Sequence, residues 1–438
     1  MLIGQAGPLP SAPSSKTVFV EDLPEDQRAA AESLTPPGLV NLGNTCYLNS
    51  TVQALVAVPE LRVALQKFRP VANANSTDAL FAARFAELSR ELTFGGDSVQ
   101  PDAFLATLRQ INPQFGEQGE HGYEQQDADE CLLTMLQALS RQLTVADTAA
   151  SSSSSLSSSS SSSPGVPNTV IHQLFGIEMD VTLRNTFNAA EPLERKRELV
   201  LKLAAHIDKE TKFLTKCIEL SLVGELEKTS SLTNSSAVYQ KTSRLARLPL
   251  ILTVQFVRFF WKAGADKKPG NKSKIVKPVE FPFTLDVLDY CSDELKATLA
   301  PARQKLCELD DAQHGVKAAA TAATASTASS AAESSASTSS AMATDEPDGK
   351  KPRLAASAAF DNHTGLYELA ALVTHKGRDA DGGHYVAWVK EKADQWLLYD
   401  DERVSRVKDD DIKKLSGSGG VDWHMAYFAF YRARTVGN

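Results

Sequence analysis

Apolar residues recur at helical spacing in the first half of the chain. One stripe comprises Leu48, Val52, Leu55 and Val56. It begins directly after Cys46, has Asn44 and Thr45 as candidate caps, and is disturbed at Pro59. A second stripe comprises Leu132, Leu136, Leu139 and Leu143. Asp127 and Glu130 precede it in a capping-box pattern, and residues 81–92 are a further amphipathic stretch. These patterns predict a helical first half.

The second half carries stretches rich in β-branched and aromatic residues, which are typical of strands. They are residues 248–260, 367–374, 385–391, 395–399 and 424–432. Helices followed by strands predict an α+β fold with an antiparallel sheet.

Three segments lack the periodicity of a packed element. Residues 1–37 are rich in proline and read as a linker or arm. A serine tract at about 148–166 and an Ala/Ser/Thr-rich stretch at 310–357 carry too few large apolar residues to offset the entropy of ordering, so we expect disordered inserts. Residues 38–434, which contain both inserts, are expected to form one folded domain.

Composition narrows the class of partner. The chain has 438 residues, 42% of them hydrophobic, and a formal net charge of −8 without a long basic run. We therefore expect no nucleic-acid partner and favour a neutral or basic protein. No signal pattern or long apolar span is visible, so we expect a cytoplasmic protein without a membrane partner. Lys350, Lys351 and Arg353 are either a nuclear-import signal or simply solvated.

The five cysteines are scattered and odd in number, and none forms a CxxC pair. This distribution argues against both a disulfide framework and a structural zinc site, and we expect no metal and no cofactor.

Cys46 is a candidate nucleophile. A helix that starts just after it would place the thiol at a helix N-terminus, where the partial positive charge favours the thiolate. The preceding Gly43, Asn44 and Thr45 would form a tight turn that exposes it. A buried structural cysteine is the alternative, because many intracellular cysteines are inert packing residues.

His384 is a candidate base. It opens a predicted strand that turns at about 392–394 and returns over 395–399, so position 384 faces roughly position 401. Asp400 and Asp401 therefore lie opposite His384, where a carboxylate can orient an imidazole. Successive side chains alternate, so one acid should face His384 and the other should not, and pairing alone does not choose. A solvated hairpin end without function is the alternative.

His375 and His424 are less suited to the role of base. Neither has an acidic pair in register or a glycine-rich approach, and both are expected to be surface or packing residues.

Three longer motifs carry a family resemblance. Residues 38–49, with Cys46 near their end, resemble the cysteine box of the ubiquitin-specific proteases. Residues 383–386 and 396–401 resemble their histidine box, and 125–130 resemble the segment between. Residues 16–22, 243–245, 257–260 and 422–424 are similar to the proteasome-associated branch of that family.

The resemblance implies a papain-like fold with a helical thumb, an antiparallel-sheet palm and β fingers. It implies that Cys46 attacks the carbonyl of ubiquitin's terminal glycine and that His384 accepts the thiol proton. Asp400 would orient His384, with Asp401 as a helper. Asn41 matches the position that donates to the oxyanion, although a turn residue is the alternative.

The resemblance also implies the substrate and its contacts. Asp127 matches a position that binds the basic tail of ubiquitin, while also being a suitable helix cap. Gln126 lies in the same segment, and Tyr385 is expected to wall a narrow tunnel for the tail. The implied activity is a deubiquitinating thiol hydrolase, acting on proteasome-bound conjugates. A ubiquitin-binding scaffold with little activity, or a protease for another ubiquitin-like modifier, are the alternatives.

The sequence departs from the family in two places. Many members hold the fingers with two zinc-binding cysteine pairs, but residues 176–247 contain only Cys217, so the strands must hold themselves together. The related branch carries an N-terminal ubiquitin-like domain, and this sequence begins at what resembles the linker. We therefore expect the catalytic domain without that domain.

Overall fold

The computed structural model describes residues 35–69, 76–93, 98–120, 122–144, 169–188, 190–230, 232–262, 271–313, 360–378, 382–420 and 423–435. The expected insert at 148–166, nearly all of the second insert, and most of the N-terminal arm lie outside this set. None of the described helices is long and apolar enough to span a membrane.

The described chain is mainly helical as far as Phe175, as the apolar stripes predict. Its helices are α2 (Cys46–Val56), α3 (Pro59–Lys67), α4 (Thr77–Glu91), α5 (Asp102–Ile111), α6 (Ala128–Ser140) and α7 (Val170–Phe175). Short elements join them: the 3₁₀ turn η2 (Pro113–Gly116) and the hairpin of β1 (Gln118–Gly119) and β2 (Gly122–Tyr123). Pro59 begins α3 because the first helical position needs no backbone N–H donor. These helices form the thumb.

Only part of the predicted helix capping is observed. Thr45 occupies the N-cap of α2 without a capping hydrogen bond, because its hydroxyl accepts from the backbone N–H of Leu42 instead. Asp127 does cap α6, accepting from the N–H of Asp129 at 2.9 Å. Glu130 accepts from Gln114 rather than closing a capping box. Thr45 and Glu130 therefore hydrogen-bond to partners that the capping patterns do not include.

An eight-stranded sheet forms the palm. Its order is β15-β14-β13-β12-β16-β8-β5, with β11 beside β12. The strands are β5 (Leu203–His206), β8 (Ile251–Val257), β11 (Thr284–Asp286), β12 (Leu366–Lys376), β13 (His384–Lys392), β14 (Gln395–Asp400), β15 (Arg403–Val407) and β16 (Met425–Ala433). All neighbours are antiparallel except β5 and β8. The α10 helix (Asp409–Lys413) and the 3₁₀ turn η6 (Lys414–Ser416) lead from β15 toward β16.

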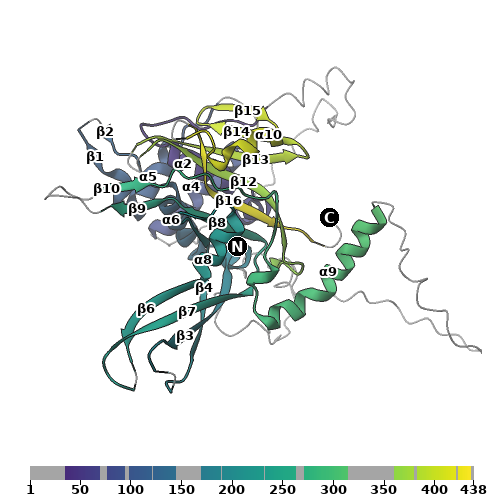
Figure 1. Ribbon diagram of the computed structural model, residues 1–438. Helices are drawn as coiled ribbons and strands as arrows, with labels where there is room; N and C mark the ends of the chain where they lie inside the picture. The colour runs from purple at the N-terminus through teal and green to yellow at the C-terminus, as the bar shows by residue number, and fades with distance from the viewer. Residues whose placement is uncertain are drawn as a thin grey trace, which may run out of the picture.

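The predicted strand over 248–260 is in fact two elements. β8 ends at Val257, and β9 (Phe259–Lys262) leaves the sheet to pair with β10 (Asn271–Lys274). The division falls at Arg258, which is fully buried and bonds the backbone of β16. The β9–β10 hairpin projects away from the palm (Figure 1).

A second, four-stranded sheet forms the fingers, which point away from the thumb helices in Figure 1. Its order is β4-β3-β7-β6, all antiparallel. Its strands are β3 (Ile177–Asn185), β4 (Glu194–Val200), β6 (Val223–Thr229) and β7 (Ser236–Arg247). The helix α8 (Leu214–Leu222) precedes β6 and carries buried Cys217.

The tips of the fingers are joined by a buried carboxylate. Glu191, in the β3–β4 connection, accepts hydrogen bonds from Asn185 (2.6 Å), Ser230 (2.9 Å) and Tyr239 (2.8 Å). Ser230 and Tyr239 belong to the β6–β7 hairpin, so one side chain links both hairpins. Hydrogen bonds to a charged group are stronger than neutral ones. The expectation that the strands hold themselves together therefore has a physical basis among the described residues.

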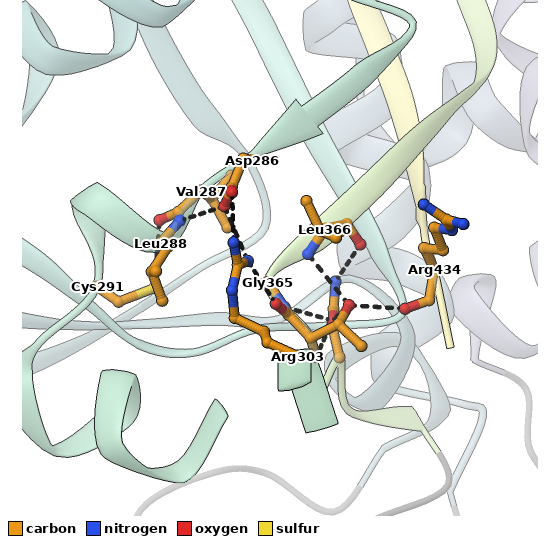
Figure 2. Close-up of polar contacts among 10 residues, drawn as sticks. Asp286, Val287, Leu288, Cys291, Arg303, Gly365, Leu366 and Arg434 are labelled. Atoms are coloured by element: carbon orange, nitrogen blue, oxygen red, sulfur yellow. Dashed lines mark hydrogen bonds and ion pairs between the residues drawn. The ribbon is translucent and has the colours of Figure 1, made fainter. Parts of the chain in front are cut away.

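The helix α9 (Asp293–Gln313) is fixed to the palm by Arg303 (Figure 2). Its guanidinium donates to both oxygens of Asp286, at 3.1 and 2.7 Å, and to the carbonyl of Thr364 at 2.8 Å. The η4 turn (Leu288–Tyr290) links β11 to this helix. The helix extends beyond residue 310, where we expected the second insert to begin. Arg434 pairs there with Asp310 at 2.6 Å, which favours the last turn.

Candidate active site

Cys46 is the first residue of α2, as the sequence predicts. The turn before it uses left-handed backbone at Gly43 (φ +93°) and Asn44 (φ +54°). Asn44 anchors this turn by donating from its side chain to the carbonyl of Tyr123 in β2 at 2.8 Å. Only 2% of Cys46 is exposed, so the turn does not leave it open to solvent as we expected. Its sulfur is 3.5 Å from the backbone nitrogen of Tyr385.

His384 opens β13 and is held from one side by Asp400. Nε2 of His384 is 2.6 Å from Oδ1 of Asp400, the last residue of β14. A hydrogen bond with Asp400, followed by one with Cys46, raises the pKa of His384 to about 10. The same contact with His384 lowers the pKa of Asp400. The site is therefore arranged to hold an imidazolium between a sulfur and a carboxylate.

The two adjacent acids face different partners, as expected, but Asp401 lies in the turn after β14, so strand alternation is not the cause. Asp401 has left-handed backbone (φ +51°) and turns away from the Asp400–His384 contact. Its Oδ2 accepts from the side-chain amide of Asn41 at 2.8 Å, and its Oδ1 accepts from that of Asn49 at 2.8 Å. Burial raises the pKa of Asp401, while the two asparagines oppose that effect. The structure thus assigns a different partner to each acid, a choice that hairpin pairing alone could not make.

Asn41 is fixed in the turn before Cys46. Its side-chain oxygen accepts from the backbone N–H groups of Gly43 (3.0 Å) and Thr45 (3.2 Å), and its own N–H donates to Glu402 at 2.9 Å. One hydrogen of its amide nitrogen points to Asp401, which leaves the second without an acceptor among the described residues. Asn41 is therefore both a turn residue and a rigid amide donor beside the thiol.

Two of the residues expected to contact the ubiquitin tail, Asp127 and Tyr385, both contact Tyr427. Asp127 caps α6 and also accepts from the hydroxyl of Tyr427 at 2.5 Å. The ring of Tyr385 packs 5.7 Å from that of Tyr427, and both are buried. Gln126 is buried as well. The structure brings Asp127 and Tyr385 to one place through Tyr427, which the sequence reasoning did not single out.

Some residues of the site were missed. Asn49 lies within the cysteine-box motif, and its position one helical turn after Cys46 is a signal that could have revealed it. His375 is fully buried, whereas His424 is half-buried. Burial lowers the pKa of His375 to about 3 and that of His424 to about 4. Both are packing residues, the second of the two expected roles, but each also makes polar contacts.

Within the described ranges, His384, Asp400 and Asp401 are the three donors close enough to share a metal ion. Hydrogen bonds within the protein already occupy them: Asp400 bonds His384, and Asp401 bonds Asn41 and Asn49. The cluster is better explained as an imidazole with its supporting carboxylates than as a metal centre.

A thiol at a helix N-terminus, facing an imidazole–carboxylate pair on an antiparallel sheet, defines a papain-like cysteine hydrolase. The thumb supplies Cys46 and the palm supplies His384 and Asp400, so the site forms only where the two meet.

Comparison with known proteins identifies the family. The profile described as ubiquitin carboxyl-terminal hydrolase matches residues 37–431. Ubiquitin carboxyl-terminal hydrolase 6 of Arabidopsis thaliana is 39% identical over all of this chain and 86% of its own length. The Schizosaccharomyces pombe protein of the same name is 34% identical, covering 100% and 85%. Ubiquitin carboxyl-terminal hydrolase 14 of Caenorhabditis elegans is 31% identical, covering 100% and 81%. The chain belongs to the ubiquitin carboxyl-terminal hydrolase family and is a cysteine-type deubiquitinase.

Proposed function

We propose that Cys46 is the nucleophile, His384 the general base and Asp400 the orienting acid of this deubiquitinase. The observation that carries the proposal is the placement of His384 between Cys46 and Asp400, with 2.6 Å between Nε2 and Oδ1. The thiolate attacks the carbonyl carbon of ubiquitin's terminal glycine and forms a C–S bond. The C–N bond to the leaving amine then breaks, and His384 gives that amine its proton. Water, deprotonated by His384, releases ubiquitin from the thioester.

Asn41 supports the oxyanion in this proposal. Its amide nitrogen has one hydrogen directed to Asp401, and the other is available to the developing negative charge. Removing one such donor typically costs about a hundred- to a thousand-fold in kcat. Asp401 is a helper because it fixes the orientation of that amide rather than contacting His384.

Gln126, Asp127 and Tyr385 would contact the tail of ubiquitin. Capping α6 and accepting from Tyr427 fix the Asp127 carboxylate, and a carboxylate can accept hydrogen bonds from a basic residue. Tyr385 is buried and its backbone nitrogen lies 3.5 Å from the Cys46 sulfur, which supports a role in restricting the tunnel to glycine.

We further propose that the substrates are ubiquitin conjugates bound to the proteasome, in the cytoplasm and the nucleus. The resemblance of 243–245 and 257–260 to the proteasome-associated branch supports this partner. Segments 16–22 and 422, which share the resemblance, lie outside the described residues.

The test uses ubiquitin with a thiol-reactive group at its C-terminus. We expect a covalent adduct with the unsubstituted protein and none with Cys46→Ala, whose thermal unfolding should remain cooperative. Purified proteasome should increase the rate of adduct formation. An adduct that persists in Cys46→Ala would rule out the nucleophile. Reaction only with a probe built on another ubiquitin-like modifier would overturn the substrate, and an unchanged rate with proteasome would overturn the partner.

A further inference from the structure

Two buried cations lie at the base of the β9–β10 hairpin. Arg258 is 0% exposed and Lys274 is 8% exposed. Among the described residues neither forms an ion pair with a carboxylate. Arg258 donates instead to the backbone carbonyls of Ala426, Ile275 and Lys277. Burying a charge is costly without compensating hydrogen bonds, so such a pair needs an explanation.

Lys274, the last residue of β10, donates hydrogen bonds from its side chain to the segment that leads to His384. Nζ is 2.8 Å from Nδ1 of His375, 2.8 Å from the carbonyl oxygen of His375 and 3.0 Å from that of Gly377. An ammonium has three hydrogens, and these contacts account for all of them. The hairpin is thereby fastened to the end of β12.

His375 extends this contact to the other end of the β12–β13 connection. Because the carbonyl oxygen of Gly382 can only accept, the ring proton of His375 resides on Nε2, and Nδ1 accepts from Lys274. Nε2 then donates to the carbonyl of Gly382 at 3.1 Å. Gly382 is two residues before His384. The carbonyls at both described ends of the connection, Gly377 and Gly382, are held by one Lys–His unit.

At Gly377 and Gly383 the backbone around this unit is packed too closely for a side chain. Gly377 (φ +122°) and Gly383 (φ +112°) both use left-handed backbone. A Cβ on Gly383 would lie 2.1 Å from the carbonyl oxygen of Lys376 and 2.7 Å from Nε2 of His375. The imidazole of His375 therefore contacts the residue immediately before His384. Any movement of this ring moves the start of β13.

The same ring is supported from its other sides by aromatic side chains. Phe259, which pairs with Lys274 across the hairpin, lies 5.5 Å from the His375 ring, and Tyr385 lies 4.5 Å from it. Burial, followed by the charge of Lys274, keeps His375 neutral by lowering its pKa to about 3. Neutral imidazole is the form that can accept from Lys274 and donate to Gly382.

We propose that Lys274 and His375 are positioning residues for His384: they hold the backbone at Gly377 and Gly382, on either side of the β12–β13 connection, and fasten it to the β9–β10 hairpin. The proposal rests on the assignment of His384 as the base. An apolar pair would fill this part of the core without the cost of burying a charge. What the polar pair adds is one hydrogen bond between Lys274 and the His375 ring, and three to the backbone carbonyls of His375, Gly377 and Gly382, close to the strand that carries the base.

The first test is Lys274→Met, which keeps the length of the side chain and removes its three donors. We expect kcat for a fluorogenic ubiquitin amide to fall about tenfold to a hundredfold, because small displacements of a catalytic group have effects of this size. KM should change less than kcat. The pH at which iodoacetamide alkylates Cys46 at half its maximal rate should rise, since the thiol loses its positioned imidazole. Exposed Cys307, followed in the same digest by mass spectrometry, should alkylate unchanged.

Lys277→Met is the matched control. Lys277 also donates its ammonium to two backbone carbonyls, those of Asp208 (3.1 Å) and Lys209 (2.5 Å), but at a distance from the connection. Its kcat and the Cys46 alkylation profile should match those of the unsubstituted protein. A Lys274→Met protein that unfolds at lower temperature, but keeps its kcat and Cys46 profile well below that temperature, would reduce the pair to a structural role.

His375→Asn keeps the test decisive if Lys274→Met does not fold. An asparagine oxygen can still accept from Lys274, but the donor to Gly382 is lost. We expect the same shift of the Cys46 profile with a smaller loss of kcat, and an unchanged profile would overturn the proposal. Failure of the underlying assignment would be visible separately. If His384 is not the base, His384→Ala, made with Lys274 and His375 intact, would leave the pH profile of Cys46 alkylation unchanged.

Discussion

Two adjacent aspartates with different partners dominate the site at the scale of single residues. Asp400 bonds His384, whereas Asp401 bonds Asn41 and Asn49. Their pKa values move in opposite directions, because contact with His384 lowers that of Asp400 and burial raises that of Asp401. One acid stabilises the charged imidazole, and the other orients the amide beside Cys46. A substitution at either position should therefore impair catalysis by a different route.

Asp400→Asn should lower kcat by about a hundredfold or more, because the imidazolium loses the carboxylate that stabilises and orients it. The pKa of His384, which Asp400 raises more than any other group does, should fall toward its ordinary value. The activity of the variant should therefore lose its alkaline limb at a lower pH than that of the unsubstituted protein. The measurement is kcat against pH with a fluorogenic ubiquitin amide.

Asp394→Asn is the control for that prediction. Asp394 lies at the other end of the β13–β14 hairpin in left-handed backbone (φ +56°), which asparagine adopts readily. It should retain full activity. Equal losses in both variants would show that hairpin integrity, rather than the contact with His384, is what activity requires.

At the scale of elements, the fingers depend on a side chain in a loop. Glu191 joins the β3–β4 connection to the β6–β7 hairpin, through Ser230 and Tyr239. Removing one partner of a buried hydrogen-bond network leaves the others unsatisfied, at about 1–3 kcal/mol. This network lies within residues 176–247, the region in which we expected the strands to hold themselves together.

Glu191→Ala should loosen the finger tips without unfolding the palm. Hydrogen–deuterium exchange should increase in residues 185–194 and 229–239, while exchange in β12 and β13 stays unchanged. Glu194→Gln is the control, because Glu194 is exposed and its ion pair with Lys228 belongs to a class worth about 0–1 kcal/mol. Uniform acceleration across the palm would contradict a local role for Glu191.

At the scale of the whole molecule, buried His375 and half-buried His424, both held neutral, make stability depend on pH. Burial lowers the pKa of His375 to about 3 and of His424 to about 4, against 6.5 for the ordinary side chain. Between these values the unfolded chain binds protons that the folded chain does not. Their contribution is fully present above pH 6.5 and is lost as the pH falls toward 4 and 3.

Acidification should therefore lower the free energy of unfolding by about 1 kcal/mol per histidine for each pH unit below 6. Urea unfolding between pH 7 and pH 5 measures this slope. His424→Asn, which keeps an oxygen near Thr374 but does not titrate, should make the slope shallower. His206→Gln, at an exposed position, should leave it unchanged. An identical slope in His424→Asn would exclude that histidine as a source.

The sequence by itself determined the periodic and motif-bearing parts of this protein. Apolar spacing predicted α2 and α6, because helical periodicity is a local property. Hairpin pairing brought both acids near His384, although the observed register pairs Ala387 with Tyr399 and sets neither acid directly opposite His384. The cysteine and histidine boxes indicated the family that comparison confirmed.

Only the tertiary structure decided which hydrogen-bond partner each polar side chain of the site takes. The choice of Asp400 for His384 and Asp401 for Asn41 depends on where α2 meets β13. The break at Arg258 and the burial of Lys274 and His375 depend on strands far apart in the chain. Such contacts follow no sequence period, because a side chain's hydrogen-bond partner is set by which elements pack together, and neighbouring sequence does not contain that information.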